Sequence, residues 1–211
     1  MSARARGRFI SLEGGEGVGK STQARALSAA LRERGLEVVE TREPGGSPGA
    51  EAIRALLLEG GADRWNARSE ALLFAAARAD HVARTIAPAL ASGAWVVCDR
   101  FVDSSLAYQG GADGLGADMI RTLHAIGSEG FLPDRTLLLT LPESLAMARE
   151  AARDRGGRDR FGARDAAYHA RVGAAFHALA EADPVRWRIV DAQGEQATVT
   201  ARLIEAIGDL L

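Results

Sequence analysis

The stretch Gly14-Gly15-Glu16-Gly17-Val18-Gly19-Lys20-Ser21, followed by Thr22, decides the fold class of this chain. It matches the pattern G-x-x-x-x-G-K-[ST] at every fixed position, between an apolar run that predicts a strand and a pattern that predicts a helix. Glycines let successive backbone N–H groups of such a loop point inward, and the helix adds the positive end of its dipole. The sequence therefore predicts a phosphate-binding loop (P-loop) over residues 14–22. Lys20 is expected to contact the β- and γ-phosphates of ATP, and Ser21 to ligate Mg²⁺.

Lys20 is also the only lysine among the 26 Lys and Arg residues. The chain uses arginine for every other basic side chain, and a compact ammonium is not equivalent to a guanidinium as a phosphate ligand. The alternative is a glycine-rich turn that contains a lysine by chance. The motif, its flanking elements and the single lysine together favour the phosphate-binding interpretation.

Apolar runs and helical patterns alternate along the chain, which is typical of βα units around a parallel sheet. The expected strands are Phe9–Leu12, Val38–Thr41, Trp95–Cys98, Thr136–Leu141 and Arg188–Val190. The expected helices are Lys20–Arg34, Glu51–Leu58, Ser69–Ala87, Ala117–Ile126, Glu143–Arg153, Asp165–Ala182 and Thr198–Leu211. The third strand is a continuous apolar run, as in sheets covered on both faces. We expect an α/β fold with three layers, in one domain over residues 1–211.

Composition argues against several classes of protein. A net charge of -2 and a pI near 6.1 give no broad electrostatic footprint for a nucleic-acid polymer or an anionic membrane. Cys98 is the only cysteine, which excludes an intrachain disulfide and a multi-cysteine metal site. No stretch approaches the roughly 18 apolar residues of a spanning helix. We expect a cytoplasmic protein that binds small phosphates.

The residues after the third strand separate the classes of P-loop protein. A GTPase needs an Asn-Lys-x-Asp motif, and the only lysine lies in the P-loop. ATP hydrolases usually carry Asp-Glu after this strand, whereas this chain carries Asp99-Arg100. Alone, that pair would be an ordinary surface ion pair. Beside a P-loop, Arg100 suits a second anion, such as an acceptor phosphate, and Asp99 suits Mg²⁺ bound through water.

A glycine-broken basic segment follows the fourth strand and contains Arg153, Arg155, Arg158 and Arg160. A charge run by itself is most often a solvated face. In a chain that also has a P-loop, it favours a mobile lid over about residues 153–163 that closes on the phosphates and neutralises charge during transfer.

Four blocks, in this order, closely resemble bacterial thymidylate kinases. They are FISLEGGEGVGKST at 9–22, TREPGG at 41–46, LLFAAAR at 72–78 and DRFVDSSLAYQG at 99–110. TREPGG and DR-x-x-x-S-x-x-AYQG are specific to that family, whereas the P-loop alone is not. The resemblance implies a P-loop fold with a five-stranded parallel sheet, and ATP- and Mg²⁺-dependent phosphorylation of dTMP to dTDP in dTTP synthesis. It also implies a homodimer.

The resemblance implies roles for residues on the acceptor side. Glu16 is similar to the acid that holds the 3′-hydroxyl of the deoxyribose. Arg42 and Arg100 resemble the clamp on the acceptor phosphate, for which the planar guanidinium fork is suited. Phe74 and Arg78, one helical turn apart, resemble the pair that stacks on thymine and bonds its O4. Without the resemblance, Phe74 would be assigned to the core.

Other positions follow from the same resemblance. Ser105 occupies a position that bonds the base edge, and Tyr108 resembles the ring that disfavours a 2′-hydroxyl, with Gln109 beside it. Gly17 stands where some relatives carry an arginine, which assigns the catalytic arginine to the lid. With Lys20 and Arg100, the residues predicted to be catalytic are Arg153 and Arg158. Residues 162–163 are Gly-Ala where many relatives carry an acid, so the register of the lid arginines stays open.

Two alternatives remain at this point. A deoxynucleoside kinase would phosphorylate thymidine and would need a carboxylate base, but Arg42 would then lack an anion. A regulatory nucleotide-binding domain would have no use for the lid arginines. A dTMP kinase needs no general base, because the second pKa of a phosphate monoester is near 6. The four histidines, His81, His124, His169 and His177, are accordingly expected to be helix residues.

Overall fold

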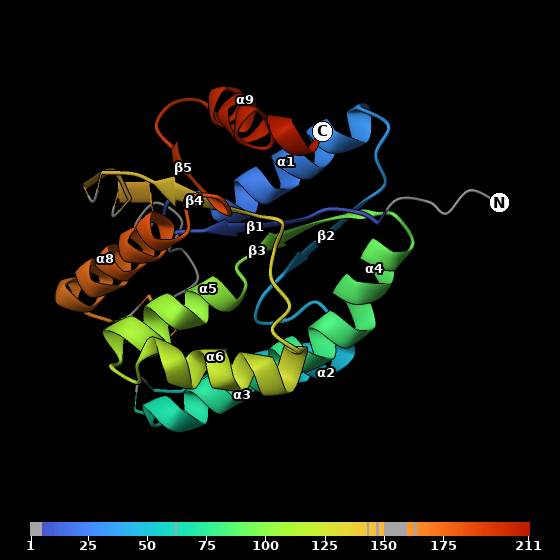
Figure 1. Ribbon diagram of the computed structural model, residues 1–211. Coiled ribbons are helices and arrows are strands. Elements are labelled where there is room, and N and C mark those ends of the chain that lie inside the picture. Colours follow the sequence, from blue (N-terminus) through green and yellow to red (C-terminus); the bar gives the residue numbers. More distant parts are fainter. Residues whose placement is uncertain (1–5, 62, 143, 147, 150–159, 163) are drawn as a thin grey trace.

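The centre of the structure is a five-stranded parallel sheet in the order β2-β3-β1-β4-β5 (Figure 1). The computed structural model describes residues 6–61, 63–142, 144–146, 148–149, 160–162 and 164–211. The strands are β1 Phe9–Glu13, β2 Val38–Arg42, β3 Trp95–Asp99, β4 Arg135–Thr140 and β5 Trp187–Asp191. Each overlaps the strand expected from the sequence, so the predicted α/β fold is confirmed. The P-loop leaves the central strand of the sheet.

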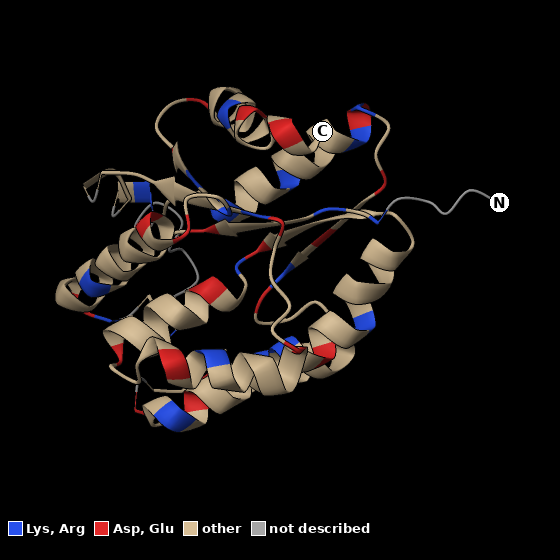
Figure 2. Ribbon diagram, viewed as in Figure 1, with Lys and Arg blue, Asp and Glu red and all other residues tan. Residues whose placement is uncertain are grey.

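Helices cover both faces of the sheet (Figure 1). Helices α1 and α9 lie on one face, and α8 and the helices of the middle third of the chain lie on the other. Their bounds are α1 Lys20–Glu33, α2 Pro48–Leu58, α3 Ala67–His81, α4 Ala87–Ala91, α5 Val102–Ser105, α6 Ala117–Ser128, α8 Ala166–Ala182 and α9 Gln196–Ala206. Residues 144–146 and 148–149 are also helical. Figure 2 shows acidic and basic residues interspersed along these helices.

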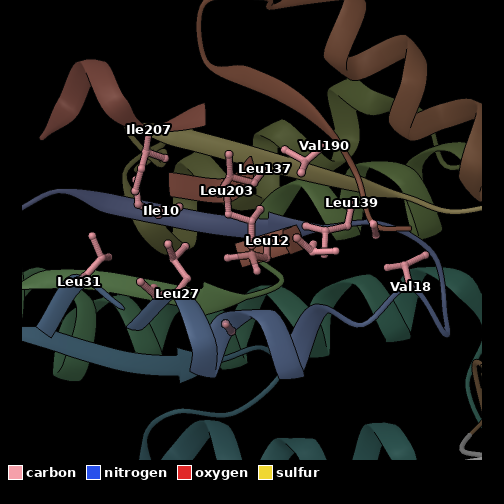
Figure 3. Close-up of a cluster of buried hydrophobic side chains, with 14 of the residues drawn as sticks. Ile10, Leu12, Val18, Leu27, Leu31, Leu137, Leu139, Val190, Leu203 and Ile207 are labelled. Carbon is pink, nitrogen blue, oxygen red and sulfur yellow. The ribbon is translucent and has the colours of Figure 1, made fainter. Parts of the chain in front are cut away.

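Strand alternation divides the core into clusters on the two faces of the sheet. Ile10 and Leu12 of β1 point toward α1 and α9, while Phe9 packs on the opposite face. Figure 3 shows the first cluster, in which Leu27 and Leu31 of α1 lie over β1. Burying one Leu or Ile side chain stabilises the fold by about 1.5–3 kcal/mol. This packing holds α1, and with it the P-loop, against the sheet.

Helix α2 begins three residues before the expected Glu51. Ser47 is its N-cap, whose hydroxyl accepts a hydrogen bond from the Ala50 N–H at 3.4 Å, and Pro48 occupies the first turn. Serine at the N-cap and proline at the first position are the preferred start of a helix. The Ser47-Pro48 pair is therefore the start of α2.

Two stretches depart further from expectation. The helix expected over Ser69–Ala87 is a longer run, in which α3 passes into a π-helical segment, Val82–Ile86, and then into α4. Pro88 follows that segment, and proline has no N–H to donate to the preceding turn. Helix α5 and the π-helical segment Leu106–Ala112 were not expected at all. π-Helical turns occur frequently at functional sites.

Within the described residues, no helix has both the length and the apolar character needed to cross a bilayer.

Candidate active site

A cavity of about 320 Å³ opens at the carboxyl ends of β1, β2 and β3. The P-loop follows β1, Arg42 ends β2, and Asp99 ends β3. Ligands of open α/β sheets bind at this edge. The predicted site residues that line the cavity are Glu16, Gly17, Gly19, Lys20, Ser21, Arg42, Phe74, Arg78, Asp99, Arg100, Ser105, Tyr108 and Gln109. The structure therefore brings residues from four separate sequence blocks to one place.

Other predicted residues lie elsewhere. Gly14, Gly15 and Val18 line a second cavity of about 330 Å³, between the P-loop, the end of β4 and α8. Thr22 is exposed on α1, where its hydroxyl accepts a hydrogen bond from Arg25 at 3.5 Å. Arg153 and Arg158, predicted to be catalytic, lie outside the described residues.

The P-loop conformation requires glycine at defined positions. Gly14, Gly17 and Gly19 have φ values of 138°, 72° and 96°, which side-chain-bearing residues rarely adopt. A Cβ built on Gly17 would also lie 2.2 Å from the Ala146 carbonyl oxygen. In this conformation the loop leaves no room for a side chain at position 17.

Lys20 lies buried at the start of α1, where its Nζ donates to the Gly15 carbonyl at 2.5 Å. Burial, and then the nearby Arg100, lower the pKa of Lys20 to about 8, while the Glu16 and Asp99 carboxylates act in the opposite direction. The positive charge is buried between the loop and a second cation, which is an environment that favours an anion.

Ser21 and Asp99 form the oxygen-rich side of the cavity. The Ser21 hydroxyl donates a hydrogen bond to Asp99 Oδ2, and Asp99 Oδ1 is buried without a hydrogen-bond partner in the described part of the chain. Mg²⁺ prefers oxygen ligands, and it usually takes one or two from the protein and the others from water and phosphate. The two side chains fit such an ion. No group of three or more His, Cys, Asp or Glu among the described residues could serve as a cage for a metal.

Arg100 lines the same cavity and is hydrogen-bonded to several neighbouring groups. Its guanidinium donates to Glu16 Oε1 at 2.6 Å, to the Gly14 carbonyl at 3.1 Å and to the Ser104 hydroxyl at 3.1 Å. The Tyr108 hydroxyl donates to the same Glu16 oxygen at 3.0 Å. Burial lowers the pKa of Arg100, but Glu16 and the other acidic groups more than offset this effect, so the pKa is raised overall. Arg100 stays charged in a buried place.

Glu13, at the end of β1, supports the turn that presents Arg100. It accepts hydrogen bonds from the Phe101 N–H at 2.8 Å and from the Ser104 hydroxyl at 2.6 Å. Burial, and then the charge of Asp103, raise the pKa of Glu13 to about 8. Sequence reasoning missed this residue, although an acid that ends an otherwise apolar strand directly before a P-loop was a usable signal.

The exposed edge of the cavity carries two more arginines. Arg42 donates to both carboxylate oxygens of Glu51, at 3.0 and 3.1 Å, and Glu51 also accepts the Gly46 N–H at 2.9 Å. Arg54 of α2 lines the same cavity, with its Nη1 donating to the Pro44 carbonyl at 2.6 Å. Arg54 was not singled out from sequence. With Arg100, these side chains place three guanidinium groups in the wall of the cavity that also contains Lys20.

The inner wall is ordered by a buried ion pair that sequence reasoning also missed. Arg78 Nε donates to Glu43 Oε2 at 2.7 Å, and Arg78 Nη2 donates to the Ser105 hydroxyl at 2.9 Å. The other Glu43 oxygen lies 3.1 Å from His81 Nδ1, and His81 Nε2 lies 2.7 Å from the Thr41 hydroxyl. Glu43 thereby ties the end of β2 to the α3 face that carries Arg78.

The comparisons with known proteins agree with this geometry. A sequence model described as thymidylate kinase matches residues 12–203. The chain belongs to the thymidylate kinase family. A thymidylate kinase of Rhizorhabdus wittichii is 70% identical over 205 residues, which cover 97% of this chain and 99% of that protein. One of Gluconobacter oxydans is 52% identical over 209 residues, covering 98% and 96%.

A solved structure gives the same family. The crystal structure of thymidylate kinase from Ehrlichia chaffeensis superimposes with a TM-score of 0.76 at 28% sequence identity, covering 96% of this chain and 99% of that chain. The fold expected from the sequence and the family expected from the four blocks are both confirmed.

In this thymidylate kinase family member, one of the four arginines assigned to a mobile lid is a buried residue. Arg160 Nη2 donates to Glu70 Oε2 at 3.0 Å, and its other nitrogens bond backbone carbonyls of the α2–α3 region. Arg160 is therefore buried and does not belong to a solvated face, which is what a charge run by itself would favour.

The four histidines lie in helices, as expected. His81 is in α3, His124 in α6, and His169 and His177 in α8. His81 is bonded within the inner wall, and His124 Nε2 lies 2.7 Å from the Phe131 carbonyl. Both buried rings thus have structural partners.

Proposed function

We propose that this protein transfers the γ-phosphoryl group of ATP to dTMP, yielding dTDP and ADP in the synthesis of dTTP. The observation that carries the proposal is one cavity whose wall contains both the P-loop cation Lys20 and three guanidinium groups, those of Arg42, Arg54 and Arg100. Several cations around one cavity fit two polyanions held close together, as in-line transfer between phosphates requires.

On the donor side, the loop amides and Lys20 would bind the triphosphate. Ser21 and Asp99 would hold Mg²⁺, which supplies neutralisation of the phosphate oxygens when it is bound. Lys20 is the one donor-side cation of the described P-loop, so its removal should abolish turnover and leave the fold intact. We expect Lys20→Ala to lose about a thousandfold or more in kcat. Near-normal turnover by that variant would contradict the assignment.

On the acceptor side, we propose that Arg42 and Arg100 clamp the dTMP phosphate and that Glu16 receives the 3′-hydroxyl of the sugar. Phe74 lines the cavity beside Arg78, where it would stack on the thymine ring while Arg78 bonds O4. Ser105, which accepts from Arg78, would fix that guanidinium at the base edge. Tyr108 and Gln109 line the floor, where a 2′-hydroxyl would be crowded.

No general base is needed for this transfer. The acceptor oxygen of a phosphate monoester is largely anionic at neutral pH, since its second pKa is near 6. The residues of the cavity then have to exclude water, align the two phosphates and stabilise the charge that spreads over the transferred group.

A substrate panel tests the proposal. The purified protein would be incubated with Mg·ATP and, separately, dTMP, dUMP, other nucleoside monophosphates and thymidine, and ADP and the phosphorylated product would be measured. We expect dTMP to give the highest kcat/KM. Preference for thymidine would indicate a deoxynucleoside kinase, and ATP binding without transfer to any acceptor would indicate a regulatory domain.

We also propose a homodimer in the cytoplasm. Helices α3 and α6 pack side by side, and their outer surface carries Leu72 and Ile126, which are 56% and 78% exposed. Large apolar side chains exposed on two packed helices fit an interaction surface. Sedimentation of the wild type and of Ile126→Asp tests the dimer: the variant should be monomeric.

The proposed cytoplasmic location rests on a different observation. Cys98 is the only cysteine and is a buried free thiol, which fits a reducing compartment.

A further inference from the structure

Arg160 is as deeply buried as Arg78 of the cavity wall, with 3% of its surface exposed. Three of its donors are satisfied within the protein. Nε bonds the Gly61 carbonyl at 2.9 Å, Nη1 bonds the Leu57 carbonyl at 2.8 Å, and Nη2 bonds Glu70 Oε2 at 3.0 Å. The guanidinium therefore joins the end of α2, the following turn and α3.

Its acidic partner reaches the cavity from the other side. Glu70 is 1% exposed, and its second oxygen accepts a hydrogen bond from Gln109 Nε2 at 2.9 Å. Gln109 lies in the π-helical segment and lines the acceptor cavity. Glu70 is thus a bridge between Arg160 and a cavity residue.

The neighbour of Arg160 in sequence also forms part of the cavity wall. Phe161 is buried, lines the cavity, and lies with its ring centroid 5.7 Å from that of Phe74 and 6.1 Å from that of Tyr108, edge to face in both cases. Because Arg160 is fixed at three points, the backbone that carries Phe161 is fixed as well.

We propose that Arg160 is a positioning residue for the acceptor site, which holds Phe161 and Gln109 in the wall that receives the nucleotide, and that it does not act on the transferred phosphoryl group. This inference rests on the proposed function. A buried guanidinium whose partners are a buried carboxylate and two carbonyls would leave an unpaired charge behind if it swung toward the phosphates. Its role is therefore to order the acceptor wall.

Steady-state kinetics separate the two roles. We expect Arg160→Met to raise the KM for dTMP by about tenfold or more, because a wall displaced by a fraction of an ångström weakens nucleotide alignment, with kcat within about threefold of the wild type. The KM for ATP should not change. Arg171→Met, which removes one exposed positive charge from α8, is the control and should match the wild type. A thousandfold loss of kcat with an unchanged KM for dTMP would overturn the inference.

A double-mutant cycle tests whether Arg160 acts through Phe161. If it does, adding Arg160→Met to a Phe161→Ala protein should raise the KM for dTMP by no more than about twofold, since the wall is already lost. Independent, multiplicative effects would contradict the proposed coupling. Glu70→Gln keeps the size of the bridge and should reproduce a milder rise in KM if Arg160→Met proves too unstable to assay.

Calorimetric titration with dTMP alone distinguishes a failure of this inference from a failure of the proposed function. The wild type tests the function by its turnover of dTMP, whereas the variants test the position of the wall by their Kd for dTMP relative to the wild type. An Arg160→Met protein that is folded by circular dichroism and binds dTMP as tightly as the wild type would overturn the inference even if the enzyme is a thymidylate kinase.

Discussion

The Arg100 guanidinium donates to the Glu16 carboxylate over 2.6 Å, so the acid of the P-loop and the main acceptor-side cation are held as one unit. Both side chains are largely buried, and the Tyr108 hydroxyl donates to the same Glu16 oxygen. The pair joins the two halves of the cavity. Under the proposed function, this pair would fix where an acceptor phosphate meets the P-loop.

Loss of this pair should impair catalysis more than loss of the tyrosine hydroxyl. Glu16→Ala leaves Arg100 without its carboxylate partner, so the guanidinium group is no longer held in the position from which it would contact the phosphates. We expect kcat/KM for dTMP to fall by about a hundredfold or more. Tyr108→Phe keeps the Arg100–Glu16 pair and should cost less than about tenfold. Initial rates of dTDP formation measure both, and a Glu16→Ala enzyme within threefold of the wild type would contradict this account.

Asp99 should set the Mg²⁺ requirement. One of its carboxylate oxygens accepts from Ser21, and the other is buried without a hydrogen-bond partner among the described residues. Asp99→Asn keeps the shape but removes the charge, so the Mg²⁺ concentration for half-maximal rate at fixed ATP should rise about tenfold or more. Asp118→Asn, on the solvent side of α6, should leave it unchanged. An identical Mg²⁺ dependence in Asp99→Asn and the wild type would remove Asp99 from the metal site.

Glu13 should make stability fall as pH rises. Its pKa is raised from 4.5 to about 8, so the folded protein holds this proton more tightly than the unfolded chain does. The stability that the protonated carboxyl contributes is present in full below pH 4.5 and is lost as pH rises through about 8.

Chemical denaturation across pH 4.5 to 8 measures this effect as a difference between proteins. The wild type should lose up to about 1.4 kcal/mol per pH unit relative to Glu13→Gln, which has no proton to release. Parallel stability curves for the two proteins would show that Glu13 is ionised at neutral pH, contrary to the expectation.

The sequence was sufficient for the sheet, because each strand contains consecutive apolar residues and helical patterns separate the strands. It was not sufficient for α5 and the π-helical segment after it, since residues 102–112 mix small, polar and apolar side chains without a helical stripe. Their burial comes from contact with α8, which is distant in the chain, and with α6, the next helix along it.

The residues of the candidate site were likewise identifiable from the sequence only in part. Lys20 and Ser21 were identifiable because their spacing within the loop defines the chemistry. Glu43 was not, because its partner Arg78 is 35 residues away and nothing in the local sequence says that the two side chains face each other. Arg160 was assigned to a solvated or mobile segment because the local sequence of a charge run does not show which arginine will pair with a distant buried acid such as Glu70.

Gly17 should be the least replaceable glycine for the stability of the P-loop. Its φ of 72° disfavours any side chain, and a Cβ there would lie 2.2 Å from the Ala146 carbonyl oxygen, a backbone atom that cannot turn aside. Gly15 offers a matched control, because a Cβ at Gly15 meets nothing within 4 Å. We expect Gly17→Ala to lower the free energy of unfolding by about 1–3 kcal/mol, and Gly15→Ala by less than about 0.5 kcal/mol.

Urea denaturation of the two variants beside the wild type measures the difference. Both substitutions add one methyl group to the same loop, so an effect of glycine entropy alone would be similar in the two proteins. A larger loss in Gly17→Ala isolates the left-handed backbone and the contact with Ala146. Equal stability of the two variants would mean that residues 144–146 move away from the loop at little cost, and that position 17 could accept a side chain.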